Sequence, residues 1–217
     1  MEGLLKQTYN IENKWGPYLK YGKRLFFRRK STIYLQGNKG TGFYYVEKGL
    51  IKIVTSTVGG EDKILDVSGS GRVFGEQAID EQHYFTSAVA LEDSAVYYIS
   101  AETFKELTRK YPDILALFVD SVIQKVNLLK EMISKMFTSE QRIAYCLLKL
   151  YYITGKNKIV FTQQELASYT GLTRVTVYKT LKKWKEEEAV FVENRTFFIK
   201  NPQYLANILQ TKLLNAQ

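Results

Sequence analysis

The sequence predicts an α+β protein built from three consecutive parts. We expect an N-terminal β-barrel of the jelly-roll type over residues 1–110, a long helix over 111–137 and a winged helix-turn-helix over 138–217. Three observations support this division. Short apolar runs separated by glycine turns fill the first part. A 4-3 spacing of apolar residues marks the second, and two capped helices around a glycine turn mark the third.

The composition is that of a globular protein, with 217 residues, 45% hydrophobic and 24% charged. The 31 lysines and arginines exceed the 22 acids, and the net charge of +9 favours a polyanionic partner. The chain has no secretory signal and no apolar run of transmembrane length, so we expect a cytoplasmic protein that does not bind membranes.

Several function classes lack their residues here. The sequence contains no phosphate-binding P-loop, no glycine-serine nucleophile motif and no cluster of metal ligands. The one cysteine, Cys146, excludes an intramolecular disulfide, and it is expected to be a small buried apolar side chain. We therefore expect no enzyme activity, no cofactor and no metal site.

The first part consists of short runs rich in β-branched and aromatic residues. They are STIYLQ, GFYYVEKG, LIKIVTS, KILDVSG and SAVALEDSAVYYIS, between residues 31 and 100. Several strands at this spacing are typical of a β-sandwich or barrel. Ser100 is then placed to cap a helix that starts at Ala101.

A long helix is predicted from Pro112, because proline suits the first turn of a helix. An apolar seam follows at alternating spacings of four and three: Leu115, Val119, Val122, Val126, Leu129, Ile133 and Met136. The seam could pack on the chain's own β-domain. A second stripe that includes Ile114 and Phe118 supplies that face, however, so the seam favours a parallel helix of a second copy. We expect these seven residues to form a homodimer interface.

The third part begins with Thr138, which has capping-box spacing to Gln141 after a hinge at 137–138. Thr162 and Glu165 repeat this spacing, Gly171 makes a tight turn, and Thr173 is placed to cap a second helix. Two helices joined in this way form a helix-turn-helix. A predicted β-hairpin around residues 193–195 adds the wing.

Positive charge is concentrated in this third part, which contains 12 lysines and arginines and only 6 acidic residues. Basic groups on the second helix favour DNA phosphates. Arg174 can donate two hydrogen bonds to a guanine, and Val175 can contact a thymine methyl group. The candidate DNA-binding residues are Thr162, Thr173, Arg174, Val175, Thr176, Lys179 and Lys182.

Four motifs together resemble the family of the catabolite activator protein and FNR, the CRP/FNR family. They are YYVEKGLIKI (44–53), RVFGEQAIDEQHYFTSAVAL (72–91), YPDIL (111–115) and TQQELASYTGLTRVTVYKTL (162–181). The resemblance implies a cyclic-nucleotide-binding-like domain and a homodimer that regulates transcription from a pseudopalindromic site on double-stranded DNA. It also implies that RNA polymerase is a partner if the protein is an activator.

The resemblance places an effector site in the 72–91 segment, which we call the cassette, and on the long helix. Its candidates are Gly75, Glu76, Gln77, Phe85, Thr86, Ser87, Lys125, Asn127 and Leu128. Members that bind cyclic AMP carry an arginine where this chain has Thr86, so the small-molecule effector is not expected to be a cyclic nucleotide. Lys125 resembles a lysine of members that sense halogenated phenols, and it would favour an anionic aromatic ligand.

Other sensing modes of the family lack their residues. Cys146 alone cannot hold an iron–sulfur cluster, and His83, the one histidine, lies in a polar turn unsuited to haem. Val175 replaces a glutamate that is common in the family's reading helix and favours A·T-rich sites. The sequence therefore predicts an effector-responsive regulator. The alternative is a constitutive DNA-binding protein whose pocket is filled by its own side chains.

Overall fold

A computed structural model describes residues 14–56, 62–80, 82–134 and 138–210. The chain divides into two compact units, one within Ile11–Ser134 and one within Lys135–Gln217. The long helix belongs to the first unit. Each unit is described by itself below.

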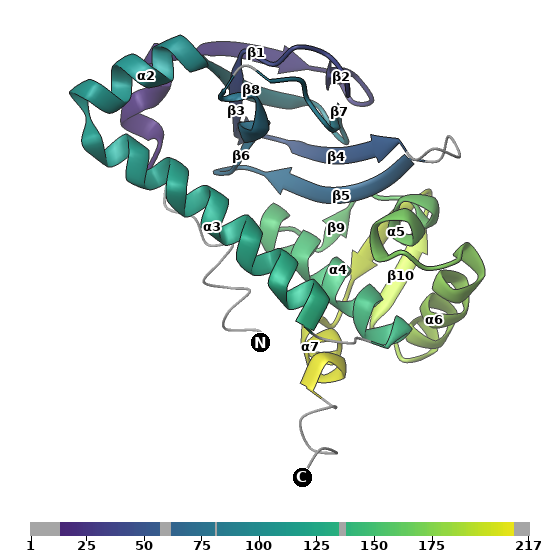
Figure 1. Ribbon diagram of the computed structural model, residues 1–217. Helices are drawn as coiled ribbons and strands as arrows, with labels where there is room; N and C mark the ends of the chain where they lie inside the picture. Colours follow the sequence, from purple (N-terminus) through teal and green to yellow (C-terminus); the bar gives the residue numbers. More distant parts are fainter. Residues whose placement is uncertain (1–13, 57–61, 81, 135–137, 211–217) are drawn as a thin grey trace. The chain divides into compact units, whose positions relative to one another are not determined.

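The first unit contains two four-stranded antiparallel sheets, with strand orders β1-β8-β3-β6 and β2-β7-β4-β5 (Figure 1). The strands are β1 (Lys23–Phe27), β2 (Thr32–Tyr34), β3 (Gly42–Lys48), β4 (Leu50–Ser56), β5 (Asp62–Gly69), β6 (Val73–Phe74), β7 (Ser87–Ala90) and β8 (Ser94–Ser100). Two short 3-10 helices, η1 (Gly16–Tyr21) and η2 (Glu76–Ala78), accompany them.

The predicted jelly roll is therefore two sheets packed face to face, and it is not a closed barrel. Val46 of β3 and Ile51 of β4 are both fully buried in one core cluster, although their strands belong to different sheets. The chain passes from one sheet to the other at Gly49, where φ is +107°. A Cβ atom there would lie 2.1 Å from Ser94 Oγ, so the crossing requires glycine.

Two helices close this unit: α2 (Ala101–Lys110) and α3 (Pro112–Ser134). Ser100 caps α2 as predicted, because its hydroxyl accepts a hydrogen bond from Thr103 N at 3.0 Å. Phe118 of α3 packs on Phe43 of β3 and Phe104 of α2, with ring centroids 5.3 Å and 4.8 Å away. This aromatic contact holds the start of α3 on the β-domain.

The second unit is a winged helix-turn-helix. Its elements are α4 (Ser139–Thr154), β9 (Lys158–Ile159), α5 (Gln163–Thr170), α6 (Arg174–Glu186), β10 (Val190–Glu193), β11 (Thr196–Ile199) and α7 (Pro202–Gln210). The wing is a three-stranded sheet in the order β10-β11-β9. Its two-residue turn is Asn194-Arg195, and both residues have positive φ, as a tight hairpin turn requires. Within the described ranges, no helix is long and apolar enough to cross a bilayer.

Candidate functional site

The helix-turn-helix angle is fixed by two caps and a left-handed turn. Thr162 accepts a hydrogen bond from Glu165 N at 3.1 Å, and Glu165 Oε2 accepts one from Thr162 N at 2.9 Å. Gly171 ends α5 with φ +68°. Thr173 then caps α6 by accepting from Thr176 N at 3.2 Å. The Thr162 hydroxyl therefore takes part in the capping box of α5. The first residues of α6, in contrast, are exposed to solvent.

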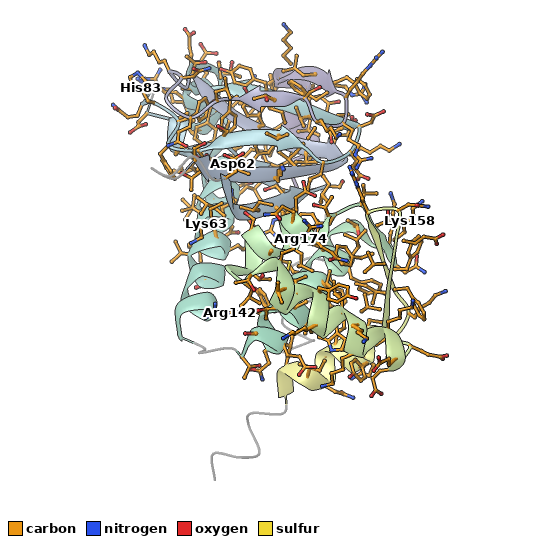
Figure 2. All side chains as sticks on the ribbon, turned by 90° about the vertical axis from the view of Figure 1, so that its right-hand side faces the viewer. Asp62, Lys63, His83, Arg142, Lys158 and Arg174 are labelled. Carbon is orange, nitrogen blue, oxygen red and sulfur yellow. The ribbon has the colours of Figure 1, made fainter. Side chains whose placement is uncertain are left out.

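The start of α6 presents several of the predicted DNA-contacting side chains on its surface. Arg174 occupies the first helical position and is exposed (Figure 2), and Val175 is 62% exposed. The Thr173 and Thr176 hydroxyls lie 2.9 Å apart. Further along α6, Lys179 and Lys182 are exposed. The residues on the opposite face are buried: Val177, Leu181 and Trp184.

Three further exposed residues of this unit were not among the DNA-binding residues predicted from the sequence. Tyr178 of α6 is 57% exposed, three residues after Val175 and therefore on the same face. Arg195 lies at the tip of the wing with φ +59°, and Lys158 of β9 is exposed (Figure 2). Tyr178 directly follows the buried Val177 in α6, and this position in the sequence could have identified it as an exposed residue. Arg195 lies in the hairpin turn that the sequence predicted around residues 193–195, and that turn was the signal for it.

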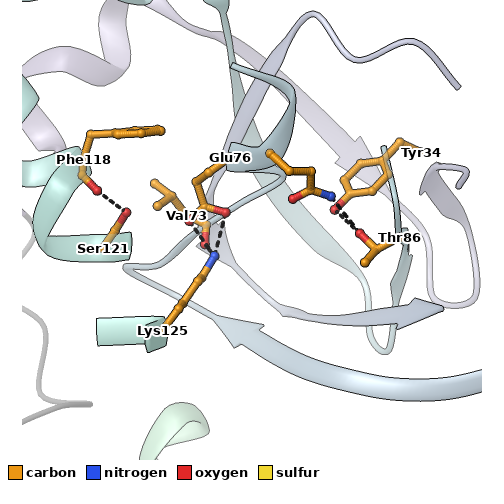
Figure 3. A network of polar contacts seen from close by, with 8 residues as sticks. Tyr34, Val73, Glu76, Thr86, Phe118, Ser121 and Lys125 are labelled. Atoms are coloured by element: carbon orange, nitrogen blue, oxygen red, sulfur yellow. Dashed lines mark hydrogen bonds and ion pairs between the residues drawn. The ribbon is translucent and has the colours of Figure 1, made fainter. Parts of the chain in front are cut away.

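The cassette brings Glu76 and Lys125 together, as Figure 3 shows. Gly75, with φ +81°, lies directly before η2, and the Glu76 side chain in the first position of η2 contacts Lys125 of α3. Lys125 Nζ lies 2.5 Å from Glu76 Oε1, 2.6 Å from Oε2 and 2.9 Å from the Val73 carbonyl oxygen. The Glu76 side chain is only 10% exposed, so its charge is compensated by a lysine of the same chain.

A second polar contact lies within the cassette. Gln77 Nε2 donates to Thr86 Oγ1 at 2.8 Å, and Tyr34 OH lies 3.5 Å from the same oxygen (Figure 3). Thr86 is 2% exposed. The position at which the resemblance expects an arginine thus holds a buried neutral hydroxyl that bonds within the chain.

Aromatic rings fill the space beside Gly75. Tyr34 and Tyr84 stack with centroids 3.9 Å apart, and Tyr44 stacks on Phe74 at 5.1 Å. A Cβ on Gly75 would meet Tyr34 and Tyr44 atoms at 3.3 Å. Burial raises the pKa of Tyr34 to about 12, so this phenol is neutral and acts as a donor or an acceptor.

The remaining effector candidates are spread over different environments. Ser87 Oγ accepts a hydrogen bond from Gln36 N at 2.9 Å, and Phe85 is 63% exposed. Asn127 is exposed on α3, and Leu128 is also on α3 but its side chain lies outside the described part. The structure therefore brings together Gly75, Glu76, Gln77, Thr86 and Lys125, and it leaves Phe85 turned to solvent.

Two residues excluded as sensors in the sequence are also placed. His83 is exposed, and among the described residues no group of histidines, cysteines and acids could hold a metal ion. Cys146 is buried in α4, and burial raises the pKa of its thiol well above the usual range. The Cys146 thiol is therefore neutral and packs as an apolar group.

The predicted interface residues form a stripe along α3. Leu115 is 50% exposed, Val119 44%, Val122 38% and Val126 45%. Leu129 and Ile133 belong to α3 but their side chains lie outside the described part, as does Met136 altogether. Ile114, one residue before the stripe, is fully buried in the unit's own core. In the part of the chain that the structure describes, the two apolar faces of α3 are thus separate: Ile114 packs in the core, and the stripe from Leu115 to Val126 is exposed.

Comparison with known proteins assigns both units. Residues 24–111 match the family model of the cyclic nucleotide-binding domain, and residues 141–208 match the Crp-like helix-turn-helix domain. Both matches lie in the order that the sequence motifs predict. The chain belongs to the CRP/FNR family. Members of this family are transcriptional regulators that bind DNA and are typically dimeric.

Relatives in the CRP/FNR family cover most of the chain. The cyclic AMP receptor protein of Thermus thermophilus is 28% identical over 194 residues, which is 88% of this chain and 89% of the relative. The fumarate and nitrate reduction regulatory protein of Escherichia coli is 25% identical over 190 residues, covering 83% and 76%. The structure of FixK2 from Bradyrhizobium japonicum has the same fold, with TM-score 0.74, 17% identity and coverage of 86% and 96%.

Proposed function

We propose that this CRP/FNR protein regulates transcription as a homodimer that reads a pseudopalindromic DNA site with α6. The observation that carries the proposal is the start of α6, where Arg174 and Val175 are exposed beside a buried core face. An α-helix fits the major groove, where an arginine can hydrogen-bond a guanine and a valine can contact a thymine methyl group. Lys179 and Lys182 supply cations for phosphates.

The exposed stripe of α3 supports the dimer. Four of its residues, Leu115, Val119, Val122 and Val126, repeat at spacings of 4, 3 and 4 on a helix whose other apolar face is already buried. Such a stripe favours a parallel helix of a second copy. Two copies of α6 would then read two half-sites about one helical turn apart.

The cassette supports an effector other than a cyclic nucleotide. A cyclic phosphate needs a cation, but the arginine position holds Thr86, which bonds Gln77 and Tyr34. Lys125, the nearby cation, is bound to Glu76. An anionic aromatic effector would have to separate this ion pair in order to use Lys125, so the structure gives such a ligand less support than the sequence did.

The same contacts favour a second candidate, constitutive DNA binding. Glu76 and Lys125 compensate each other, Gln77 and Thr86 bond each other, and Tyr34 and Tyr84 stack in the core. Each of these groups has a partner within the chain, which favours a pocket filled by the chain's own side chains. In either case the protein would act in the cytoplasm, and as an activator it would contact RNA polymerase.

The test is capture of fragmented genomic DNA by the purified full chain, with and without a small-molecule extract of the host. We expect enrichment of fragments that share an inverted repeat, and weaker enrichment with relaxed selection at one base pair of each half-site for Arg174→Ala. Enrichment only with extract identifies an effector-gated regulator, whereas equal enrichment identifies constitutive binding. Failure to enrich any repeat in both conditions contradicts the proposed function.

A further inference from the structure

The first turn of α4 contacts the far end of the reading helix α6. Glu140 Oε1 accepts hydrogen bonds from Trp184 Nε1 at 2.9 Å and from Lys183 Nζ at 3.0 Å. Trp184 is fully buried, whereas the side chains of Lys183 and Glu140 are 57% and 34% exposed. One carboxylate oxygen therefore receives both a buried neutral donor and an exposed cation.

The buried indole makes this contact specific in geometry. An indole N–H can only donate a hydrogen bond. Leaving this donor unpaired in a buried core is unfavourable. Although burial of Glu140 acts in the opposite direction, the hydrogen bonds from Trp184 and Lys183 lower the pKa of its carboxyl. Glu140 is therefore ionised at neutral pH, and a charged acceptor gives a stronger hydrogen bond.

The same turn of α4 is anchored on its other side. Thr138 and Gln141 form a capping box, with Gln141 N donating to Thr138 Oγ1 at 3.2 Å. Gln141 Nε2 donates to the carbonyl oxygen of Ile208 in α7 at 3.2 Å. The position of Glu140 is thus set by the cap and by the contact of α4 with α7. The hydrogen bonds to Glu140 therefore anchor the carboxyl-terminal end of α6 on α4.

The helix converts a small movement at this end into a larger one at the other. Trp184 is ten residues after Arg174, so at 1.5 Å per residue the two are separated by roughly 15 Å along α6. A tilt of about 5° around Trp184 would move Arg174 by about 1 Å on a lever of this length. A displacement of that size would weaken hydrogen bonds to a base edge, because these bonds require a narrow range of distances and angles.

We propose that Glu140 is a positioning residue for DNA reading: through Trp184 it sets the orientation in which α6 presents Arg174. The inference rests on the proposed function, because it presumes that Arg174 reads a base. Glu140 itself need not touch DNA. It also makes α4, whose first turn holds Glu140, one of the elements that orient α6.

The experiment compares Glu140→Ala, Glu140→Gln and Glu186→Ala in the full chain. Binding is measured to the enriched duplex and to an unrelated duplex, below the melting temperature of every variant. Glu140→Ala should lower affinity for the enriched duplex about tenfold and affinity for the unrelated duplex much less, since only the specific complex depends on α6 orientation. Glu140→Gln should restore specific binding to within about twofold, because the amide oxygen accepts from the indole.

Glu186→Ala is the matched control, since it removes the same charge from an exposed position at the same end of α6. It should bind both duplexes as the parent does. The ¹H–¹⁵N resonance of the Trp184 indole, assigned with Trp15→Phe, should shift in Glu140→Ala and remain near its parental position in Glu140→Gln. Trp184→Phe, which removes the donor and leaves no unpaired indole, should lose specific binding as Glu140→Ala does.

Three results would overturn the inference. Glu140→Ala or Trp184→Phe could retain full discrimination between the duplexes, or Glu140→Gln could lose as much as Glu140→Ala. Equal weakening on both duplexes would make the contact one of stability alone. If the parent prefers no duplex, the proposed function itself fails. If the parent discriminates and Arg174→Ala does not, while Glu140→Ala does, only the positioning role fails.

Discussion

At the scale of single residues, Arg174 and Lys182 have different tasks on one helix. Arg174→Ala should weaken binding to the preferred site by about 1–3 kcal/mol and relax selection at one base pair, because a bidentate contact to guanine is lost. Lys182→Ala should weaken binding to all duplexes alike and reduce the salt dependence by about one charge. Fluorescence anisotropy titrations at several salt concentrations measure both. Uniform weakening by Arg174→Ala would reduce that residue to a phosphate contact.

Tyr34 gives the β-domain a pH dependence at the alkaline end. Its pKa is raised by burial to about 12, so the folded state holds the phenolic proton more tightly than the unfolded state. The stability that this provides is complete below pH 10 and is lost as pH rises toward 12, by about 1.4 kcal/mol per pH unit for each such tyrosine. Urea unfolding between pH 9 and pH 12 should show a smaller decline for Tyr34→Phe. An identical decline would show that Tyr34 titrates normally.

At the scale of elements, caps and glycine turns were predictable because their partners are close in sequence. Ser100, Thr138, Thr162 and Thr173 all accept the predicted hydrogen bonds three residues on. Contacts between distant elements were not predictable, because nothing in the local pattern pairs them. The cassette residues were identified by resemblance, yet the bond between Glu76 and Lys125 joins residues 49 apart.

That ion pair holds the middle of α3 on η2, so it is tested as a contact between elements. Lys125→Met leaves the Glu76 carboxylate, 10% exposed, without its cation. We expect a loss of about 2 kcal/mol in the free energy of unfolding, below the cost for a fully buried pair because Lys125 is partly exposed. The double variant Lys125→Met with Glu76→Gln should recover most of it. Urea unfolding measures all three, and additive losses would mean that the two side chains act independently.

At the scale of the whole molecule, the order of the parts followed from the sequence, but their packing did not. The predicted β-barrel is two open sheets, and the consecutive strands β3 and β4, joined at Gly49, belong to different sheets. The long helix lies within the first unit, since Ile114 and Phe118 pack with that unit's core. Periodicity predicted that α3 has two apolar faces, and the structure places the predicted stripe of Ile114 and Phe118 against the core of the first unit.

The exposed apolar stripe of α3 leads to a prediction about dimer formation. Val119→Glu places a charge in the apolar stripe and should weaken self-association roughly a hundredfold or more, because the carboxylate would be buried without a partner. Gln124→Glu adds the same charge to α3 outside the stripe and should not. Sedimentation equilibrium measures the change, and circular dichroism checks that both variants remain helical. A dimer that tolerates Val119→Glu would place the interface elsewhere.

In the proposed function, two copies of this chain read one DNA site together through α6. Selection of bound duplexes from a random pool tests it most directly, with the parent chain and Val119→Glu run in parallel. We expect the parent to enrich an inverted repeat with half-sites about 10 base pairs apart, centre to centre, and Val119→Glu to enrich it far less. Enrichment of a single unrepeated site, or of the same repeat by both proteins, would show that two copies do not read the site together through this interface.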